Sequence, residues 1–322
     1  MITLSKKQDV DFTILNLTDP QLTDSEWKVG HKNRQILEYT VDELVKRVKP
    51  DLITISGDIT FAGNDKAYDM FAQFINSYGI PWSVVWGNHD NQNGDEYVKG
   101  IVQRYMEYEG FVYESGDAKL GNGNFIIKIE ENGAPVSALI MMDSHDREPF
   151  TDEEGNTELK WARLIPEQRV WLKETANELK SEGYNDATLI MHIPIFEYTK
   201  ASEAAYKKNI DLKEISVEDA NGVECWNDGY TDSIGVQHED ISCYPKDDGI
   251  LNEIKSTNIV KRLVCGHDHI SNWMIKYDDI DLIFSLKTGA GCYWEPDISG
   301  GTVIKINKSG VYKIHHEYVN AL

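Results

Sequence analysis

Five short apolar runs, rich in β-branched side chains, recur along the chain with longer helical patterns between them. Between the first two runs, Ile36, Leu37, Val41 and Leu44 repeat at the spacing of one helical face, and Pro50 ends the pattern. Strands that alternate with amphipathic helices are typical of βαβ units, whose sheet is buried on both faces. The predicted strands and the residues that end them are FTILNLTD (12–19), DLITISGD (51–58), PWSVVWGNHD (81–90), ATLIMH (187–192) and IVKRLVCGHDH (259–269).

The rest of the pattern predicts further amphipathic helices and pairs of antiparallel strands. The segment 124–144 contains an Asn-Gly pair between two apolar stretches, which indicates a hairpin. The segments 272–289 and 301–319 have the pattern of strands and turns in succession. We therefore predict an α/β fold of two mixed β-sheets flanked by helices, in preference to one doubly wound sheet. The additional helices are expected at 65–79, 94–110 and 166–183.

The apolar periodicity weakens between residues 200 and 248, where acidic residues dominate. This stretch lacks the apolar pattern that a core of its own would need. We predict a single domain over residues 1–322 with an insertion at about 200–248.

Composition and charge narrow the classes of function. The 54 acidic and 32 basic residues give a net charge of −22, which argues against loose electrostatic binding to nucleic acid or anionic lipid. No run of about 18 apolar residues predicts a membrane span, and the start MITLSKKQDV lacks the apolar core of a secretory signal, so a cytoplasmic location is expected. The four cysteines form no CxxC pair; we expect isolated thiols, with a Cys225–Cys243 disulfide as the alternative.

The residues that end the five strands carry the chemistry. In open α/β sheets, ligands bind outside the carboxyl ends of the strands, so these endings can meet in one crevice. Each alone has an ordinary explanation, as a helix N-cap, a turn or a core histidine. Together they supply the oxygen and imidazole ligands of a two-metal centre, each after a strand. They are Asp19, Asp58 in GD, Asn88-His89-Asp90 in GNHD, His192, and His267 and His269 in GHDH.

This ordered series resembles the calcineurin-like metallophosphoesterases, including the purple acid phosphatases, over nearly the whole chain. The segments WGNHD, HIP and GVQHEDIS are similar to the purple-acid-phosphatase-like branch. The resemblance implies a sandwich of two mixed sheets between helices and a dinuclear centre of Mn or Fe, with Zn as an alternative. Its implied ligands are Asp19 and His269 for the first metal, Asn88, His192 and His267 for the second, and Asp58 as the bridge.

The activity that the resemblance implies is hydrolysis of phosphoric esters, as a phosphatase or a phosphodiesterase, by a hydroxide that bridges the metals. His89 would bond a phosphoryl oxygen or protonate the leaving oxygen, and Asp90 would orient the His89 ring or raise its pKa. A small phosphoester or a phosphoprotein is the expected substrate. A nuclease is disfavoured by the charge of −22. A non-catalytic binding scaffold with a degenerate site is the alternative from another class.

Two positions depart from the family pattern. Gln21 stands where Asp-x-His would place a histidine; its side-chain oxygen makes it a candidate ligand that favours Mn, Mg or Fe, and a polar loop residue is the alternative. Phe61 stands three residues after Asp58, where purple acid phosphatases have a tyrosine.

Because Phe61 provides no phenolate, the iron-loaded protein should lack the charge-transfer band that gives purple acid phosphatases their colour. The absorption spectrum of an iron-reconstituted sample tests this. A visible band that requires bound iron would contradict it.

Overall fold

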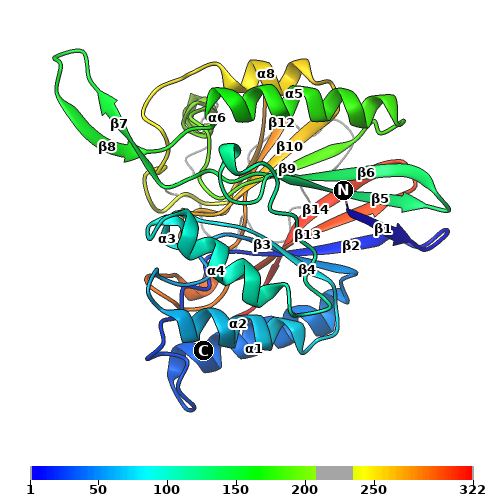
Figure 1. Ribbon diagram of the computed structural model, residues 1–322, viewed down its shortest axis with the longest axis vertical. Helices are drawn as coiled ribbons and strands as arrows, with labels where there is room; N and C mark the ends of the chain where they lie inside the picture. Colours follow the sequence, from blue (N-terminus) through cyan, green and yellow to red (C-terminus); the bar gives the residue numbers. More distant parts are fainter. Residues whose placement is uncertain (1, 208–234, 321–322) are drawn as a thin grey trace.

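The computed structural model describes residues 2–207 and 235–320, and it confirms the predicted class, with two mixed β-sheets between layers of helices (Figure 1). All five predicted strand runs form strands. The larger sheet has the order β1 (Ile2–Lys6), β5 (Phe125–Glu131), β6 (Ala134–Met141), β9 (Ala187–Ile190), β10 (Val260–Cys265), β12 (Ile280–Phe284) and β11 (Met274–Tyr277). The smaller sheet has the order β14 (Gly310–Tyr318), β13 (Gly300–Asn307), β2 (Phe12–Leu17), β3 (Leu52–Ser56) and β4 (Trp82–Val85).

Helices cover the outer face of each sheet. The four predicted helices are present as α1, α2, α4 and α5. The apolar side chains of the first three pack on the smaller sheet, and those of α5, α6 and α8 pack on the larger one. Their bounds are α1 (Lys32–Val48), α2 (Asp65–Asn76), α4 (Asp95–Tyr105), α5 (Pro166–Ser181), α6 (Glu197–Lys207) and α8 (Ile250–Ser256).

Alternation along the β5–β6 hairpin shows why the two sheets stack. Ile127 and Leu139 point into the core that includes the smaller sheet, whereas Ile126 and Ile140 point to the helices on the other face. Successive side chains of a strand face opposite sides, so a strand that is apolar at every position must be covered on both. The predicted Asn-Gly turn joins the two strands, with positive φ at Asn132 and Gly133.

The direction of the strands brings the predicted site residues to one edge of the sheets. β2, β3 and β4 are parallel, as are β6, β9, β10 and β12. The residues predicted for the site follow the carboxyl ends of β2, β3, β4, β9 and β10. Backbone hydrogen bonds join the loops beyond them, from Asp19 N to Gly57 O at 3.1 Å and from Gly266 N to His192 O at 3.1 Å. The last bond connects loops that lie far apart in the sequence, so the crevice is built by pairing between strand ends.

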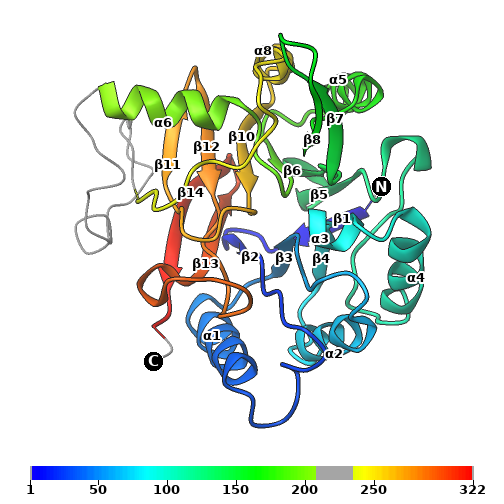
Figure 2. The ribbon, with the colours of Figure 1, turned by 90° about the vertical axis from the view of Figure 1, so that its left-hand side faces the viewer.

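Several features did not follow from the sequence pattern. They include the edge strand β1, the helix α6, and a hairpin of β7 (Arg147–Thr151) and β8 (Thr157–Trp161) that projects from the body of the molecule (Figures 1 and 2). Most of the predicted insertion, together with Cys225 of the alternative disulfide, lies outside the described residues. Within the described residues, no helix combines the length and the apolar character needed to cross a bilayer.

Candidate metal centre

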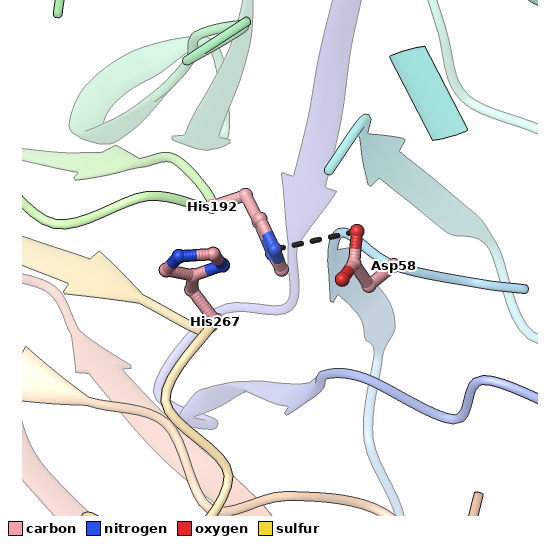
Figure 3. Close-up of side chains that lie close together, drawn as sticks. All are labelled: Asp58, His192 and His267. Carbon is pink, nitrogen blue, oxygen red and sulfur yellow. Dashed lines mark ion pairs between the residues drawn. The ribbon is translucent and has the colours of Figure 1, made fainter. Parts of the chain in front are cut away.

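Three of the predicted side chains converge most closely. Asp58, His192 and His267 are buried, and each offers a ligand atom within 4.8 Å of the others' (Figure 3). His192 Nε2 lies 3.4 Å from Asp58 Oδ1. These residues follow β3, β9 and β10, so the centre straddles the two sheets.

Two histidines are held so that one ring nitrogen faces an acidic oxygen. His192 Nδ1 donates to the carbonyl of Ser56 at 2.7 Å, and His269 Nδ1 donates to the carbonyl of Tyr293 at 3.0 Å. A neutral imidazole that donates from Nδ1 has only a lone pair at Nε2. His269 Nε2 lies 3.3 Å from Asp19 Oδ1, so a lone pair meets a carboxylate there.

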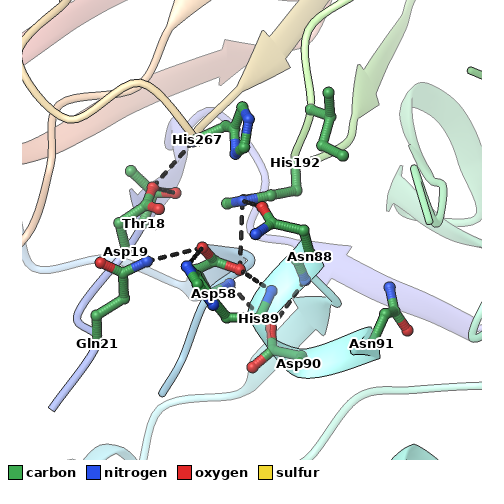
Figure 4. Close-up of polar contacts among 12 residues, drawn as sticks. Thr18, Asp19, Gln21, Asp58, Asn88, His89, Asp90, Asn91, His192 and His267 are labelled. Atoms are coloured by element: carbon green, nitrogen blue, oxygen red, sulfur yellow. Dashed lines mark hydrogen bonds and ion pairs between the residues drawn. The ribbon is translucent and has the colours of Figure 1, made fainter. Parts of the chain in front are cut away.

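The Nε2 atom of His192 also faces oxygen atoms that can only accept hydrogen bonds. Its Nε2 lies 3.1 Å from Asn88 Oδ1 in addition to the Asp58 contact, and Figure 4 shows these side chains pointing toward one another. Acceptors that face acceptors in a buried site require a proton or a metal ion between them. The arrangement thus has the chemistry of a cation site.

Unsatisfied buried atoms support this reading. Asp19 Oδ1 and His267 Nε2 are buried and accept no hydrogen bond from the described part of the chain. Buried polar atoms normally have partners, and an orphaned lone pair is a reason to expect an ion. Carboxylate, imidazole and amide-oxygen donors are those that Mn, Fe and Zn accept, so the residues present fit such metals.

The pKa values of His192 and His267 are shifted by burial and by the charged groups that lie close to them. Burial favours the neutral form of His192, but the carboxylates of Asp58 and Asp19 outweigh it and raise the pKa of His192 to about 10. Burial and the neighbouring His192 lower the pKa of His267 to about 3. One histidine thus carries a proton that balances the carboxylates, in a place where a metal ion would replace it.

The backbone turns sharply at three of the candidate ligand positions. Asp19, Asp58 and His267 have φ values of 53°, 52° and 76°, in the left-handed region that side chains seldom occupy. Such strain persists only where surrounding contacts enforce it, and it clusters at functional sites. Here each turn follows a strand and directs a side chain into the crevice.

Asp90 has a different place from the one predicted. Its carboxylate accepts hydrogen bonds from the backbone N–H groups of Gly87 (2.8 Å), Asp58 (2.9 Å) and Ile59 (3.2 Å) and from the hydroxyl of Tyr68 (2.7 Å). Both oxygens are thus used within a fully buried pocket. The expectation that Asp90 orients the His89 ring does not match this geometry; Asp90 instead joins the GD and GNHD loops.

The partner of His89 is a residue that the sequence analysis missed. Gln92 Nε2 donates to His89 Nδ1 at 3.1 Å, so the ring proton is placed on Nε2. That Nε2 lies 4.0 Å from Asp58 Oδ2, and the ring packs against Phe61 with centroids 4.4 Å apart. The side chain is 30% exposed, which leaves it accessible at the rim of the centre. The three-residue spacing from His89, on the short helix α3 (Asn88–Asn91), to Gln92 at its C-cap was the available signal.

Gln21 lies beside the centre but turns its nitrogen toward it. Gln21 Nε2 donates to Asp58 Oδ2 at 2.7 Å, and its oxygen points away from Asp58 (Figure 4). An amide nitrogen offers no lone pair to a metal ion.

Lys287 is a second residue that the sequence analysis missed. It is buried next to the loop that follows β2, where its ammonium group donates to the carbonyl of Asp19 at 2.5 Å. A lysine directly after an apolar run, in SLKTG, was the signal for it.

The part of the predicted insertion that the structure describes after residue 234 borders the centre. Glu239 accepts a hydrogen bond from the Tyr293 hydroxyl at 2.6 Å and from the backbone of Ile270 at 2.6 Å. Tyr293 in turn stacks on His269, with ring centroids 4.1 Å apart. This segment therefore supports one of the candidate ligand histidines.

Comparison with known proteins places this geometry in context. The family model described as calcineurin-like phosphoesterase matches residues 12–271. The chain is 25% identical over 258 residues to the protein named probable inactive purple acid phosphatase 28 of Arabidopsis thaliana. The aligned part covers 71% of this chain and 56% of that protein. It is 24% identical over 301 residues to phosphatase DCR2 of Saccharomyces cerevisiae. The aligned part covers 86% of this chain and 46% of that protein. The chain thus spans about half the length of these curated relatives.

A solved structure shares the fold. The crystal structure of a dimetal phosphatase from Danio rerio aligns with a TM-score of 0.56 at 14% identity, over 95% of this chain and 99% of that chain. At this identity the similarity concerns the fold alone.

Close approach of the GNHD loop to Asp58 gives a test of the centre. A Cβ on Gly87 would lie 2.2 Å from Asp58 Oδ1 and 2.5 Å from its backbone nitrogen. Gly87→Ala should therefore displace Asp58, weaken metal binding at least tenfold and lower the free energy of unfolding by about 1–3 kcal/mol.

Metal-binding isotherms and thermal unfolding measure both effects. Gly100→Ala is the matched control, because a Cβ on Gly100 in α4 meets nothing within 4 Å. It should leave metal affinity unchanged and stabilise the helix by about 0.5–1 kcal/mol. Equal metal affinity in the two variants would count against the role given to the GNHD loop.

Proposed function

The chain belongs to the calcineurin-like phosphoesterase family, and from this premise we propose that it hydrolyses phosphoric esters with two bound metal ions. The observation that carries the proposal is the convergence of buried acceptors, above all His192 Nε2 against Asp58 Oδ1 and Asn88 Oδ1. Without a metal these groups need a proton on His192 to balance the carboxylates, and a bound cation would take the place of that proton. The substrate class is a small phosphoester or a phosphoprotein.

In the proposed ligand set, each metal ion has its own group of ligands and both ions share Asp58. Asp19 and His269 would hold the first ion, Asn88, His192 and His267 the second, and Asp58 would serve both. Manganese or iron suits these oxygen and imidazole donors, with zinc as the alternative. When bound, such ions provide Lewis acidity toward phosphoryl oxygens and lower the pKa of a water that can attack phosphorus.

Gln21 has a supporting role in this proposal. Its amide donates to Asp58 Oδ2 and so restrains the carboxylate that the two positions share. In this orientation the amide nitrogen, which has no lone pair for a metal, faces Asp58; Gln21 Oε1 is buried without a hydrogen-bond partner among the described residues, and its role as a ligand stays a prediction. Lys287 acts from behind, where its bond to the Asp19 carbonyl stabilises the left-handed turn at Asp19.

His89 is the proposed proton donor to the leaving oxygen. Gln92 holds the ring so that Nε2 carries the proton and faces the centre, while Phe61 packs against the ring. A side chain at the rim with a proton near the Asp58 carboxylate is placed to meet the leaving group.

The test of the proposal is metal content together with turnover. Protein reconstituted separately with Mn, Fe and Zn should bind two ions per chain and release phosphate or alcohol in a screen of monoesters and diesters. Asp58→Asn should lose both ions, because the shared carboxylate is removed from both positions. Neither metal nor turnover after loading would favour the non-catalytic scaffold.

His89→Ala should lower turnover by about 10²–10⁴-fold while metal content stays at the wild-type value. Gln92→Leu should produce a smaller loss and shift the pH profile, because it removes the bond that fixes the His89 tautomer. Steady-state kinetics with metal analysis on each variant measure these effects. Full turnover in metal-replete His89→Ala would show that this ring transfers no proton.

A further inference from the structure

The projecting hairpin of β7 and β8 carries one cation that differs from its neighbours. Lys160 pairs with Glu158 at 2.7 Å, and Arg163, just after β8, pairs with Glu148 at 3.1 Å. The Arg147 side chain makes no hydrogen bond or ion pair with any part of the chain that the structure describes, and it is exposed. In a strongly acidic protein, a guanidinium that makes no hydrogen bond or ion pair has its N–H groups available to an external anion.

The position of Arg147 links it to the metal centre. Arg147 and Trp161 face each other at the base of the hairpin, and the guanidinium carbon lies 4.2 Å from the centroid of the Trp161 ring. Trp161 meets the His267 ring at nearly a right angle, with centroids 4.4 Å apart. A single aromatic ring therefore separates the unpaired cation from a candidate metal ligand.

Asp146, the residue before Arg147, interacts electrostatically with Arg147 and with residues of the centre. Burial raises the pKa of Asp146, whereas Arg147 and His89 lower it and Asp58 raises it. Asp146 is thus an electrostatic neighbour of Arg147 and also of His89, the proposed proton donor. The backbone at this point is fixed, because Ala162 N donates to Asp146 O at 3.1 Å and closes the base of the hairpin.

Stacking on Trp161 prepares Arg147 for recognition. A guanidinium that lies over an indole is held by the cation–π attraction, and its N–H groups stay free at its edge. Those N–H groups can donate two parallel bonds to a phosphate or carboxylate. The rest of the hairpin carries acidic side chains that repel anions, so Arg147 marks the place where an anion would be attracted. They are Glu148, Asp152, Glu153, Glu154 and Glu158.

We propose that Arg147, stacked on Trp161, forms a second subsite that binds an anionic group on the leaving-group side of the substrate. The inference rests on the proposed function and specifies its substrate class: phosphoesters whose leaving group bears a second phosphate or a carboxylate. Arg147 transfers no proton; it positions the leaving group beside His89.

Three ligands of similar size test the subsite. They share one phosphoester and differ in the other end: n-propyl phosphate has a methyl group, 3-phosphoglycerate a carboxylate, and propane-1,3-diol bisphosphate a second phosphate. Calorimetric titration of the Mn-loaded protein gives the preference for an anionic tail as a ratio of dissociation constants. We expect wild-type protein to prefer at least one anionic tail by tenfold or more, and Arg147→Gln to remove about tenfold of that preference.

Lys160→Gln is the matched control, because it removes a cation from the same hairpin that is already paired with Glu158. It should leave the preference as in the wild type, and both variants should unfold at the wild-type temperature because the two side chains lie at the surface. Loss with the bisphosphate alone assigns a phosphate subsite, and loss with 3-phosphoglycerate assigns a carboxylate subsite. An unchanged ratio in Arg147→Gln, or no preference in the wild type, overturns the proposal.

Phosphate release from n-propyl phosphate separates this inference from the proposed function. If the wild type binds but does not hydrolyse this ester, while the preference still depends on Arg147, the hydrolase proposal fails and the subsite stands. If hydrolysis of n-propyl phosphate is the same in wild type and Arg147→Gln and the preference is also unchanged, only the subsite fails.

Discussion

The structure depends on one electrostatic constraint: buried acceptors from both sheets face one another across a narrow gap. His192 Nε2 confronts the oxygens of Asp58 and Asn88, and His269 Nε2 confronts Asp19. Lone pairs at 3.1–3.4 Å repel unless a proton or a cation lies between them. The loops that bear them must therefore be held by other contacts, and much of the surrounding polar structure does this.

Those contacts follow a common design, in which a buried polar group satisfies backbone atoms of a loop that carries a ligand. The Asp90 carboxylate collects N–H groups from the GD and GNHD loops, and Lys287 bonds the carbonyl of Asp19. Because each such group is itself buried, its loss would leave backbone atoms unpaired at a cost of roughly 1–3 kcal/mol each. The proposed ligands are thus prepositioned by the fold, with the left-handed turns at Asp19 and Asp58 held in place.

The sequence predicted the framework well because its signals are local. Period-two burial and parallel pairing send residues that follow apolar runs to one edge, so Asp19, Asp58 and His192 could be brought together before any coordinates. The role of Asp90 could not, since its partner Tyr68 lies on another helix and only the fold sets that distance. The β7–β8 hairpin was missed because its exposed, charged strands lack the apolar alternation that marks a half-buried strand.

The orientation of Gln21 makes the two proposed metal positions unequal. On the proposed ligand set, the second position draws on Asn88, His192 and His267 besides Asp58, whereas the first has Asp19 and His269 besides Asp58. A histidine at residue 21 would add a lone pair to the first position, whereas the Gln21 side chain donates a hydrogen bond from Nε2 to Asp58. Affinity rises with the number of protein donors, so the first ion should exchange more readily and keep more of its coordination open to water and substrate. The departure from the family pattern thus changes the balance between the two positions and leaves the centre itself in place.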